Sequence, residues 1–192
     1  DTWVNSIKEI LDDPQPDTLD LLYTIKLNLF ASELNVFTPK GDILTLPQGA
    51  TVLDFAFAIH SMVGSHCIGG KVNHRLVPIS HRLANGDQIE ILTSQSQTIQ
   101  PDWLNFVTTG KARGRISAAL RRAARECQRK GESILREFFK AHELEDNDSN
   151  IHKIRSYHHF DTPSTLYHAL GEGRLVLSDV DVQHLLGKKP SR

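Results

Sequence analysis

The chain has 192 residues, 22 basic and 23 acidic side chains, 39% hydrophobic residues and a mean hydropathy of −0.32. A disordered segment would have fewer apolar residues and a larger net charge than −1, so we expect one or two folded domains. No stretch is long and apolar enough for a membrane span, and the first residues do not form a signal peptide. Two cysteines, Cys67 and Cys127, are too few for a disulfide framework or a cysteine-based zinc site, which favours reduced thiols in the cytoplasm. Because the chain starts without Met and within a helical pattern, we expect it to be part of a longer protein.

The charge is unevenly distributed along the chain. Residues 1–60 carry a net charge of −6, residues 61–110 are neutral, residues 111–140 carry +7, and residues 141–192 carry −2. A concentration of basic residues indicates a polyanion or an acidic protein surface as partner, although on charge alone a solvated helix face is the simpler interpretation.

Two helices and a strand pair are predicted first. Apolar residues at helical spacing predict helices over residues 3–11 and 19–31, which we interpret as the end of an upstream domain and a connector. From Leu34 the period changes, and two short strands are predicted on either side of Lys40 and Gly41. Gly41 can supply the positive φ of a tight turn.

The next segment predicts one helix and further strands. Thr51 and Asp54 have the spacing of a capping box, and Gly64 is placed to end the helix. Its buried stripe is predicted to be Val52, Phe55, Ile59 and Val63. Strands are predicted within residues 66–73, 75–79 and 87–94, the last after an Asn85-Gly86 turn. One helix on a small mixed sheet predicts an α+β fold of the β-grasp (ubiquitin-like) type.

An all-helical segment is predicted after Pro101. Pro101 and Asp102 suit the first turn of a helix, and a long helix is expected from Lys111 to about Glu145. Its apolar stripe is predicted to comprise Ile116, Leu120, Ala123, Ala124, Cys127, Ile134 and Phe138. Further short helices are expected around residues 151–159, 165–170 and 178–186, separated by glycine-containing turns.

Motifs for catalysis are weak. His158 and His159 precede Asp161 without forming a His-Asp dipeptide, so we interpret them as exposed histidines at a helix end rather than metal ligands. Gly69-Gly70-Lys71 lacks the glycine frame of a P-loop and is not followed by Ser or Thr. We therefore predict no catalytic residue, no metal and no cofactor in this chain.

His60 lies at the predicted boundary between the buried and exposed faces of its helix. A surface histidine bound to water is the simpler interpretation from position alone. Together with Ser61, His66 and Lys71, however, it makes a polar and cationic platform that could bind an unstacked nucleotide.

Residues 36–94 resemble the TGS domain of long RelA/SpoT-type stringent-response enzymes, the GTP pyrophosphokinases and ppGpp hydrolases. The resemblance rests on VFTPKG, LPQGAT, LDFAFAIH, VG-x-x-C-x-G-x-KVN and NGDQIEILTS. PDWLNFVTTGKARGRI and TLYHALGEGRL are similar to the helical domain of the same family. The resemblance implies that residues 1–33 end the synthetase region, residues 34–95 form a TGS domain and residues 101–192 form a helical domain.

The resemblance also implies a function in RNA sensing. In that family the TGS domain contacts the 3′ CCA end of uncharged tRNA on a stalled ribosome, and the contacting histidine corresponds to His60. We therefore expect contacts with the tRNA 3′ end at His60, Ser61, His66 and Lys71. Phosphate contacts are expected at Arg113, Arg115, Arg121, Arg122 and Arg125. The region is expected to be a non-catalytic sensor that relays tRNA charging to catalytic domains.

Two functions of other classes stay open at this point. SpoT-type family members use the TGS domain to sense acyl carrier protein, whose acidic surface would suit a basic patch, and the basic helix could also dock on the enzyme's own catalytic half. An autonomous hydrolase that uses the histidines would instead bind zinc or manganese.

Overall fold

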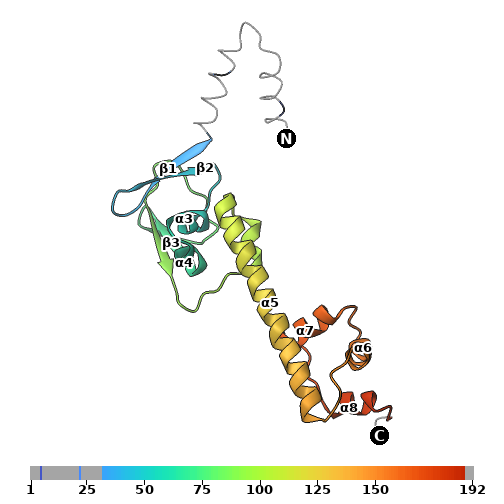
Figure 1. Ribbon diagram of the computed structural model, residues 1–192. Helices are drawn as coiled ribbons and strands as arrows, with labels where there is room; N and C mark the ends of the chain where they lie inside the picture. The colour runs from blue at the N-terminus through green and yellow to red at the C-terminus, as the bar shows by residue number, and fades with distance from the viewer. Residues whose placement is uncertain (1–4, 6–21, 23–31, 189–192) are drawn as a thin grey trace. The chain divides into compact units, whose positions relative to one another are not determined.

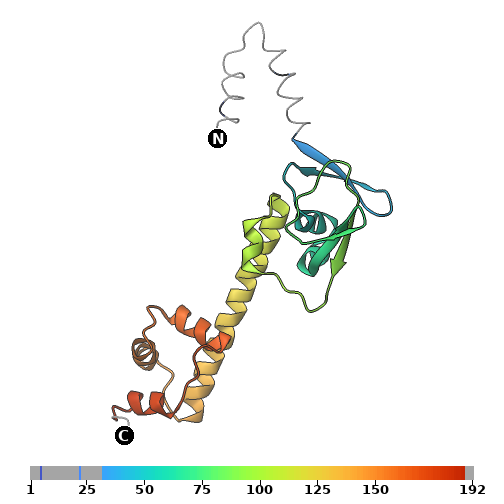
Figure 2. The same ribbon diagram turned by 180° about the vertical axis from the view of Figure 1, so that it is seen from behind.

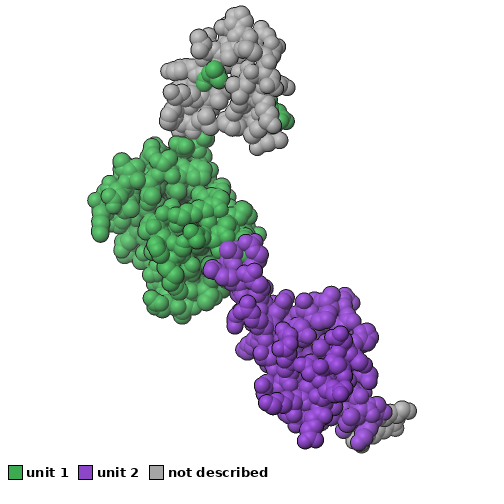
Figure 3. All heavy atoms as spheres, viewed as in Figure 1, with its two compact units in different colours: residues 1–117 green, residues 118–192 purple. Residues whose placement is uncertain are grey.

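The computed structural model describes Asn5, Leu22 and residues 32–188 (Figure 1, Figure 2). The predicted helices at residues 3–11 and 19–31 otherwise lie outside the described residues. The chain divides into two compact units, one ending at Ser117 and the other beginning at Ala118 (Figure 3).

The first unit has the predicted α+β fold. β1 (Glu33–Phe37) and β2 (Ile43–Pro47) form an antiparallel hairpin. β3 (Cys67–Val72) pairs antiparallel with both β4 (Arg75–Val77) and β5 (Ile89–Thr93). A parallel bridge between Phe37 and Gln88 joins the hairpin to the β5 side of the second sheet. The strands thus form two sheets, with the orders β1-β2 and β4-β3-β5, that are linked by this bridge. This arrangement confirms the β-grasp prediction.

Two turns in this unit follow the predicted chemistry. Gly41, between β1 and β2, has a φ of +91°, and Gly86, before β5, has a φ of +88°. Such positive values are accessible to glycine without steric cost. The Asp87 carboxylate accepts a hydrogen bond from the backbone N–H of Ala84 at 2.8 Å, which closes the turn around Gly86.

The single helix predicted between Thr51 and Gly64 is in fact two helices. α3 (Val52–Ile59) begins with the predicted capping box, in which the Asp54 carboxylate accepts from the Thr51 N–H at 2.9 Å. His60 then takes an extended backbone, with φ −164° and ψ 147°, and α4 (Ser61–Ser65) begins directly after it. The prediction of one continuous helix was wrong because His60 caps a new helix instead of continuing the first.

The break at His60 also changes which residues are buried. Val52 and Phe55 are buried as predicted, but Ile59 is 44% exposed because α3 ends there. Gly64 does not terminate a helix by a positive φ. A Cβ atom at Gly64 would lie 2.4 Å from the Phe57 ring, so this glycine allows α4 to pack closely against α3.

The first unit extends beyond the β-grasp fold. A short 3₁₀ helix, η1 (Pro101–Asn105), buries Trp103, and α5 (Gly110–Ala141) begins in the first unit and continues into the second. The boundary between the compact units therefore falls inside α5. The bounds predicted for a TGS domain (34–95) and a helical domain (101–192) stay a prediction. Within the first unit, Asp54 accepts hydrogen bonds from the residues before α5, as described below.

The second unit is all helical, as predicted. Besides the rest of α5 it contains α6 (Asp148–Tyr157), α7 (Pro163–Glu172) and α8 (Asp179–Leu185). Its core consists of Leu135, Phe139, Ile154, Leu166, Leu170 and Leu185. The predicted stripe on α5 was wrong at Ile134, which is 36% exposed, whereas Phe138 is partly buried against this core. The short helices cover mainly Leu135 and Phe139, each the next residue along α5.

Two glycines allow α5 and α7 to cross at backbone contact distance. A Cβ atom at Gly131 would lie 1.6 Å from the carbonyl oxygen of Tyr167, and one at Gly171 would lie 2.0 Å from the carbonyl oxygen of Cys127. Since no side chain can be accommodated at such distances, both positions require glycine.

His158 joins α6 to α8. Its imidazole Nε2 contacts the carboxylate of Asp181, which is only 2% exposed and also accepts from the Ser178 N–H at 2.9 Å. The interpretation of His158 as an exposed helix-end residue was therefore wrong, while His159 is exposed as expected. None of the described helices is both long and apolar enough to cross a membrane.

Candidate nucleic-acid interface

The junction between α3 and α4 exposes His60 and determines its tautomer. The Nδ1 atom of His60 accepts a hydrogen bond from the backbone N–H of Met62 at 3.0 Å. In a neutral imidazole one nitrogen accepts and the other donates, so the proton is on Nε2. His60 is exposed, and no residue of the described chain accepts a hydrogen bond from its Nε2–H. The junction therefore presents a hydrogen-bond donor to solvent.

Apolar side chains flank this donor along the chain. Ile59 is 44% exposed, Met62 is 58% exposed, and Ile68, at the start of β3, is 52% exposed. Contiguous exposed apolar side chains are typical of interaction sites, and Ile59 and Met62 lie within two residues of His60 in the chain. We name residues 59–62 together with His66 and Ile68 the His60 surface.

Ser61 and His66 belong to the same short helix as the His60 cap. Ser61 begins α4, and its carbonyl accepts a hydrogen bond from the Ser65 hydroxyl at 2.8 Å. His66 caps the other end of α4, and its Nδ1 lies 3.1 Å from the carbonyl oxygen of Gln97. Because a carbonyl oxygen only accepts, Nδ1 of His66 carries a proton, and in a neutral imidazole Nε2 is then an acceptor. The two imidazoles therefore offer opposite hydrogen-bonding groups.

Lys71 lies apart from this group. It is four residues beyond Cys67 on β3, which corresponds to about 13 Å along a strand. Its side chain lines a small hollow of about 70 Å³ with Pro39, His74, Gln88 and Glu90. None of these residues belongs to the His60 surface. The structure thus places His60, Ser61 and His66 on or at the ends of one short helix, α4, and Lys71 further along the chain on β3.

Hydrogen bonds connect the amino-terminal end of α3 to the residues that precede α5. Asp54 is 1% exposed, and its Oδ1 accepts from the backbone N–H of Thr109 at 3.0 Å and from its hydroxyl at 2.9 Å. Its Oδ2 accepts from the Thr108 hydroxyl at 2.9 Å. The capping box was the only local signal of this site, because Thr108 and Thr109 are more than fifty residues away.

These hydrogen bonds keep Asp54 ionised. Burial by itself would raise the pKa of Asp54, but hydrogen bonds from the backbone of Thr51, Thr109 and Thr108 and from the Thr109 hydroxyl outweigh it. The pKa of Asp54 is therefore held below its ordinary value. A charged carboxylate consequently connects α3 to the start of α5.

The predicted phosphate-contact residues of the first unit have different surroundings. The Arg113 guanidinium donates hydrogen bonds to the carbonyl oxygens of Val107 at 3.1 Å and Leu104 at 3.3 Å, so it stabilises the turn before α5. Arg115 is exposed and lies about 200° further around the helix. Its guanidinium makes no ion pair or hydrogen bond with any of residues 32–188. Of these two arginines, Arg115 is therefore the one whose guanidinium is available to a phosphate.

In the second unit, Arg121, Arg122 and Arg125 are exposed and make no ion pair with any described residue. Arg129 and Arg136, on the same helix, are paired with Glu126 at 3.4 Å and Glu132 at 2.7 Å. Unpaired guanidinium groups are the ones available to phosphate oxygens. For metal ions, no group of three or more His, Cys, Asp or Glu side chains in the described part of the chain is arranged as a site.

Comparison with known proteins gives a consistent family for both units. The TGS domain family matches residues 34–93. A GTP pyrophosphokinase of Myxococcus xanthus is 46% identical over 124 residues, which are 65% of this chain and 16% of that protein. A guanosine-3′,5′-bis(diphosphate) 3′-pyrophosphohydrolase of Aquifex aeolicus is 39% identical over 172 residues, which are 88% of this chain and 25% of that protein. A GTP pyrophosphokinase of Photobacterium angustum is 35% identical over 201 residues, covering 100% of this chain and 27% of its own length. The chain therefore spans between 16% and 27% of the length of these relatives.

Proposed function

Because residues 34–93 are a TGS domain and the chain is homologous over most of its length to RelA/SpoT-family ppGpp synthetases and hydrolases, we propose that it is a regulatory, non-catalytic region that senses uncharged tRNA. The His60 surface binds the 3′ CCA end of deacylated tRNA on the ribosome. The signal is relayed to the catalytic domains of a longer, cytoplasmic protein in the stringent response.

The observation that carries this proposal is the exposed Nε2–H of His60. The terminal nucleotide of tRNA offers ribose and phosphate oxygens as acceptors, and an unstacked base can rest on apolar side chains such as Ile59 and Met62. An amino acid esterified to the 3′ end would occupy the space beside the same ribose. The His60 surface therefore favours uncharged over charged tRNA.

The hydrogen bonds at Asp54 support a relay. α3 carries Asp54 in its first turn and ends immediately before His60, so the two residues lie about 9 Å apart along the helix axis. A ligand at His60 therefore acts on a helix whose other end is bound to Thr108 and Thr109. The relay would be a shift in population between arrangements of the longer protein.

A His60→Asn variant tests the proposal. Asn is a favoured N-cap, so it preserves the start of α4 while removing the Nε2 donor. We expect the affinity for deacylated tRNA, measured by fluorescence anisotropy, to fall about fivefold, the loss of roughly one hydrogen bond. His81→Asn, which changes a histidine outside the His60 surface, and wild-type binding to tRNA without CCA are the controls. Unchanged affinity of His60→Asn for CCA-ended tRNA would refute the proposal.

A second candidate function is docking on an acidic protein surface, either acyl carrier protein or the enzyme's own catalytic half. It is favoured by the unpaired guanidinium groups of Arg121, Arg122 and Arg125. Acyl carrier protein that binds the purified chain without RNA, with an affinity that decreases when these arginines are changed to Gln, would support this alternative. Binding only to tRNA would rule it out.

A further inference from the structure

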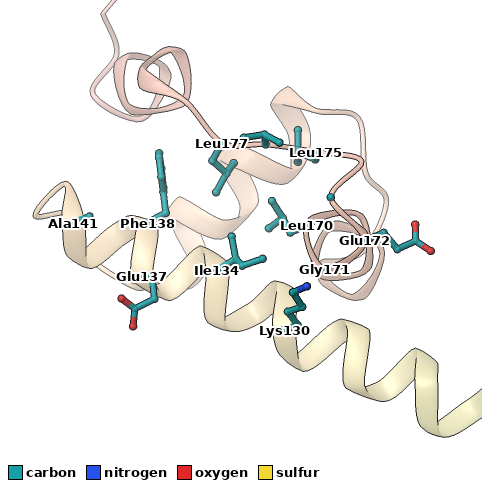
Figure 4. A pocket seen from close by; sticks show the side chains of 12 residues that line it. Lys130, Ile134, Glu137, Phe138, Ala141, Leu170, Gly171, Glu172, Leu175 and Leu177 are labelled. Atoms are coloured by element: carbon teal, nitrogen blue, oxygen red, sulfur yellow. The ribbon is translucent and has the colours of Figure 1, made fainter. Parts of the chain in front are cut away.

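An apolar groove of about 570 Å³ lies in the second unit between α5, the end of α7 and residues 173–177 (Figure 4). Ile134 and Phe138 line it from α5, and Leu170, Leu175 and Leu177 line it from the other segments. The helical spacing of apolar residues in the sequence predicted that Ile134 and Phe138 are buried. Ile134 is 36% exposed instead, and Val176 at the rim is 78% exposed. The described chain thus leaves an apolar surface uncovered here.

One cation faces this groove. Lys130 lines its end, and Figure 4 shows its ammonium group directed towards Gly171, while the carboxylates of Glu137 and Glu172 point away from the apolar side chains. Glu172 is also paired with His168 at 2.8 Å and with Arg174. No described residue forms an ion pair or hydrogen bond with Lys130. The stem of a lysine can lie along an apolar wall and place its charge at the end, so Lys130 is available to an anion.

The size and character of the groove fit a small amphiphilic molecule. Ligand sites in proteins have volumes of roughly 300–1,000 Å³ and mainly apolar walls with a few polar groups. An aliphatic chain would cover Ile134, Phe138 and Leu175, and an anionic end group would meet Lys130. We propose that the groove binds a medium-chain aliphatic carboxylate in this orientation. Its residues all belong to the second unit, so the proposal does not depend on tRNA binding at His60.

Titration of the purified chain with hexanoate, octanoate and decanoate tests this site, with calorimetry for affinity and methyl NMR spectra for location. The methyl signals of Ile134, Leu170 and Leu175 should shift. The affinity should rise about fourfold for each added methylene until the groove is filled, as expected for burial of an aliphatic chain. A neutral ligand of equal length, 1-decanol, should bind without depending on Lys130.

Three variants separate the contributions of charge and apolar surface. Lys130→Gln should weaken decanoate about two- to fivefold, in the range of an exposed ion pair, and leave decanol unchanged. Lys140→Gln, on the same helix but outside the groove, should change neither. Val176→Asp should weaken both ligands, and because Val176 is 78% exposed the fold is retained.

Three results would overturn the proposal. The first is the absence of saturable decanoate binding below its micellar concentration. The second is an equal effect of Lys130→Gln on decanoate and decanol, since the lysine would then not bind the carboxylate. The third is failure of decanoate to shift the groove signals while a photo-crosslinker at position 176 captures a polypeptide, which would make the groove a protein-docking surface.

Discussion

The carboxylate of Asp54 accepts hydrogen bonds from both the backbone N–H and the hydroxyl of Thr109, 55 residues further along the chain. The Thr109 hydroxyl in turn accepts from the backbone N–H of Ala112 at 3.1 Å and so caps the first turn of α5. One buried carboxylate therefore supports the beginnings of two helices, α3 through its own capping box and α5 through Thr109.

Replacement of Asp54 by Asn should destabilise the first unit. An amide cannot accept from all the donors around Asp54, and its NH₂ group would face backbone N–H groups. We expect the free energy of unfolding, measured by urea denaturation and circular dichroism, to fall by about 2–4 kcal/mol. Asp102→Asn is the matched control, because Asp102 is exposed on η1, and its effect should stay below about 0.5 kcal/mol. Equal effects of the two variants would contradict the role assigned to Asp54.

The contribution of Asp54 should also depend on pH. Its pKa in the folded chain is below the ordinary value of 3.8, so the unfolded chain binds a proton at higher pH than the folded chain does. The stabilisation is therefore complete above the unfolded pKa and is lost as the pH falls through the folded pKa. The difference in unfolding free energy between wild type and Asp54→Asn should be constant from about pH 5 to pH 7 and shrink below about pH 3.8. A difference that does not change with acidification would show that the charge of Asp54 is unimportant.

Gly131→Ala should destabilise the second unit. Its Cβ atom would lie 1.6 Å from the Tyr167 carbonyl oxygen, and because that atom is backbone, α7 must move. We expect a loss of about 3 kcal/mol, at the upper end of overpacking effects, seen as a lower midpoint in thermal denaturation. Gly114→Ala is the matched control on the same helix. Nothing lies within 4 Å of its Cβ position, so alanine should stabilise the helix by about 0.5–1 kcal/mol. The same sign of effect for both variants would contradict the close crossing of α5 and α7.

The two cysteines should differ in reactivity. Cys67 is fully buried, and burial raises its pKa to about 11 although its thiol also contacts the Gly69 carbonyl oxygen. At pH 8 only about 0.1% of Cys67 is the reactive thiolate. Mass spectrometry after brief treatment with iodoacetamide should therefore find Cys127, which is half-buried, modified before Cys67. In urea the two should react at similar rates. Faster modification of Cys67 in the folded chain would be inconsistent with its burial.

Arg113 and Arg115 should separate stability from RNA binding. Arg113→Gln removes hydrogen bonds to two backbone carbonyl groups and should lower the free energy of unfolding by about 1 kcal/mol. Arg115→Gln should leave stability unchanged but reduce tRNA affinity and lower the slope of its salt dependence by about one, the signature of a lost phosphate contact. Measurement of affinity at several salt concentrations checks this. An unchanged slope for Arg115→Gln would exclude a phosphate contact there.

Much of the fold was predictable from short-range patterns. The turn at Gly41 and the capping box of Thr51 and Asp54 follow from residues within four positions of one another, and the α5 period follows from residues three and four apart. The candidate residue His60 was also identified from the sequence, through its resemblance to a family motif. These features depend on residues that are close together in the chain, so they can be predicted from the sequence without knowledge of the tertiary structure.

Tertiary structure decided the features that depend on distant residues. The sequence contains Asp54, Thr108 and Thr109, but only folding brings the two threonines to the carboxylate. The tautomer of His60 follows from a helix break that its apolar period did not indicate. Likewise, burial of Leu135 instead of Ile134 was decided by the side from which α6, α7 and α8 cover α5. The spacing of apolar residues predicts which side of a helix is buried only to within about one residue. Which of two adjacent residues is buried depends on the elements that pack against the helix.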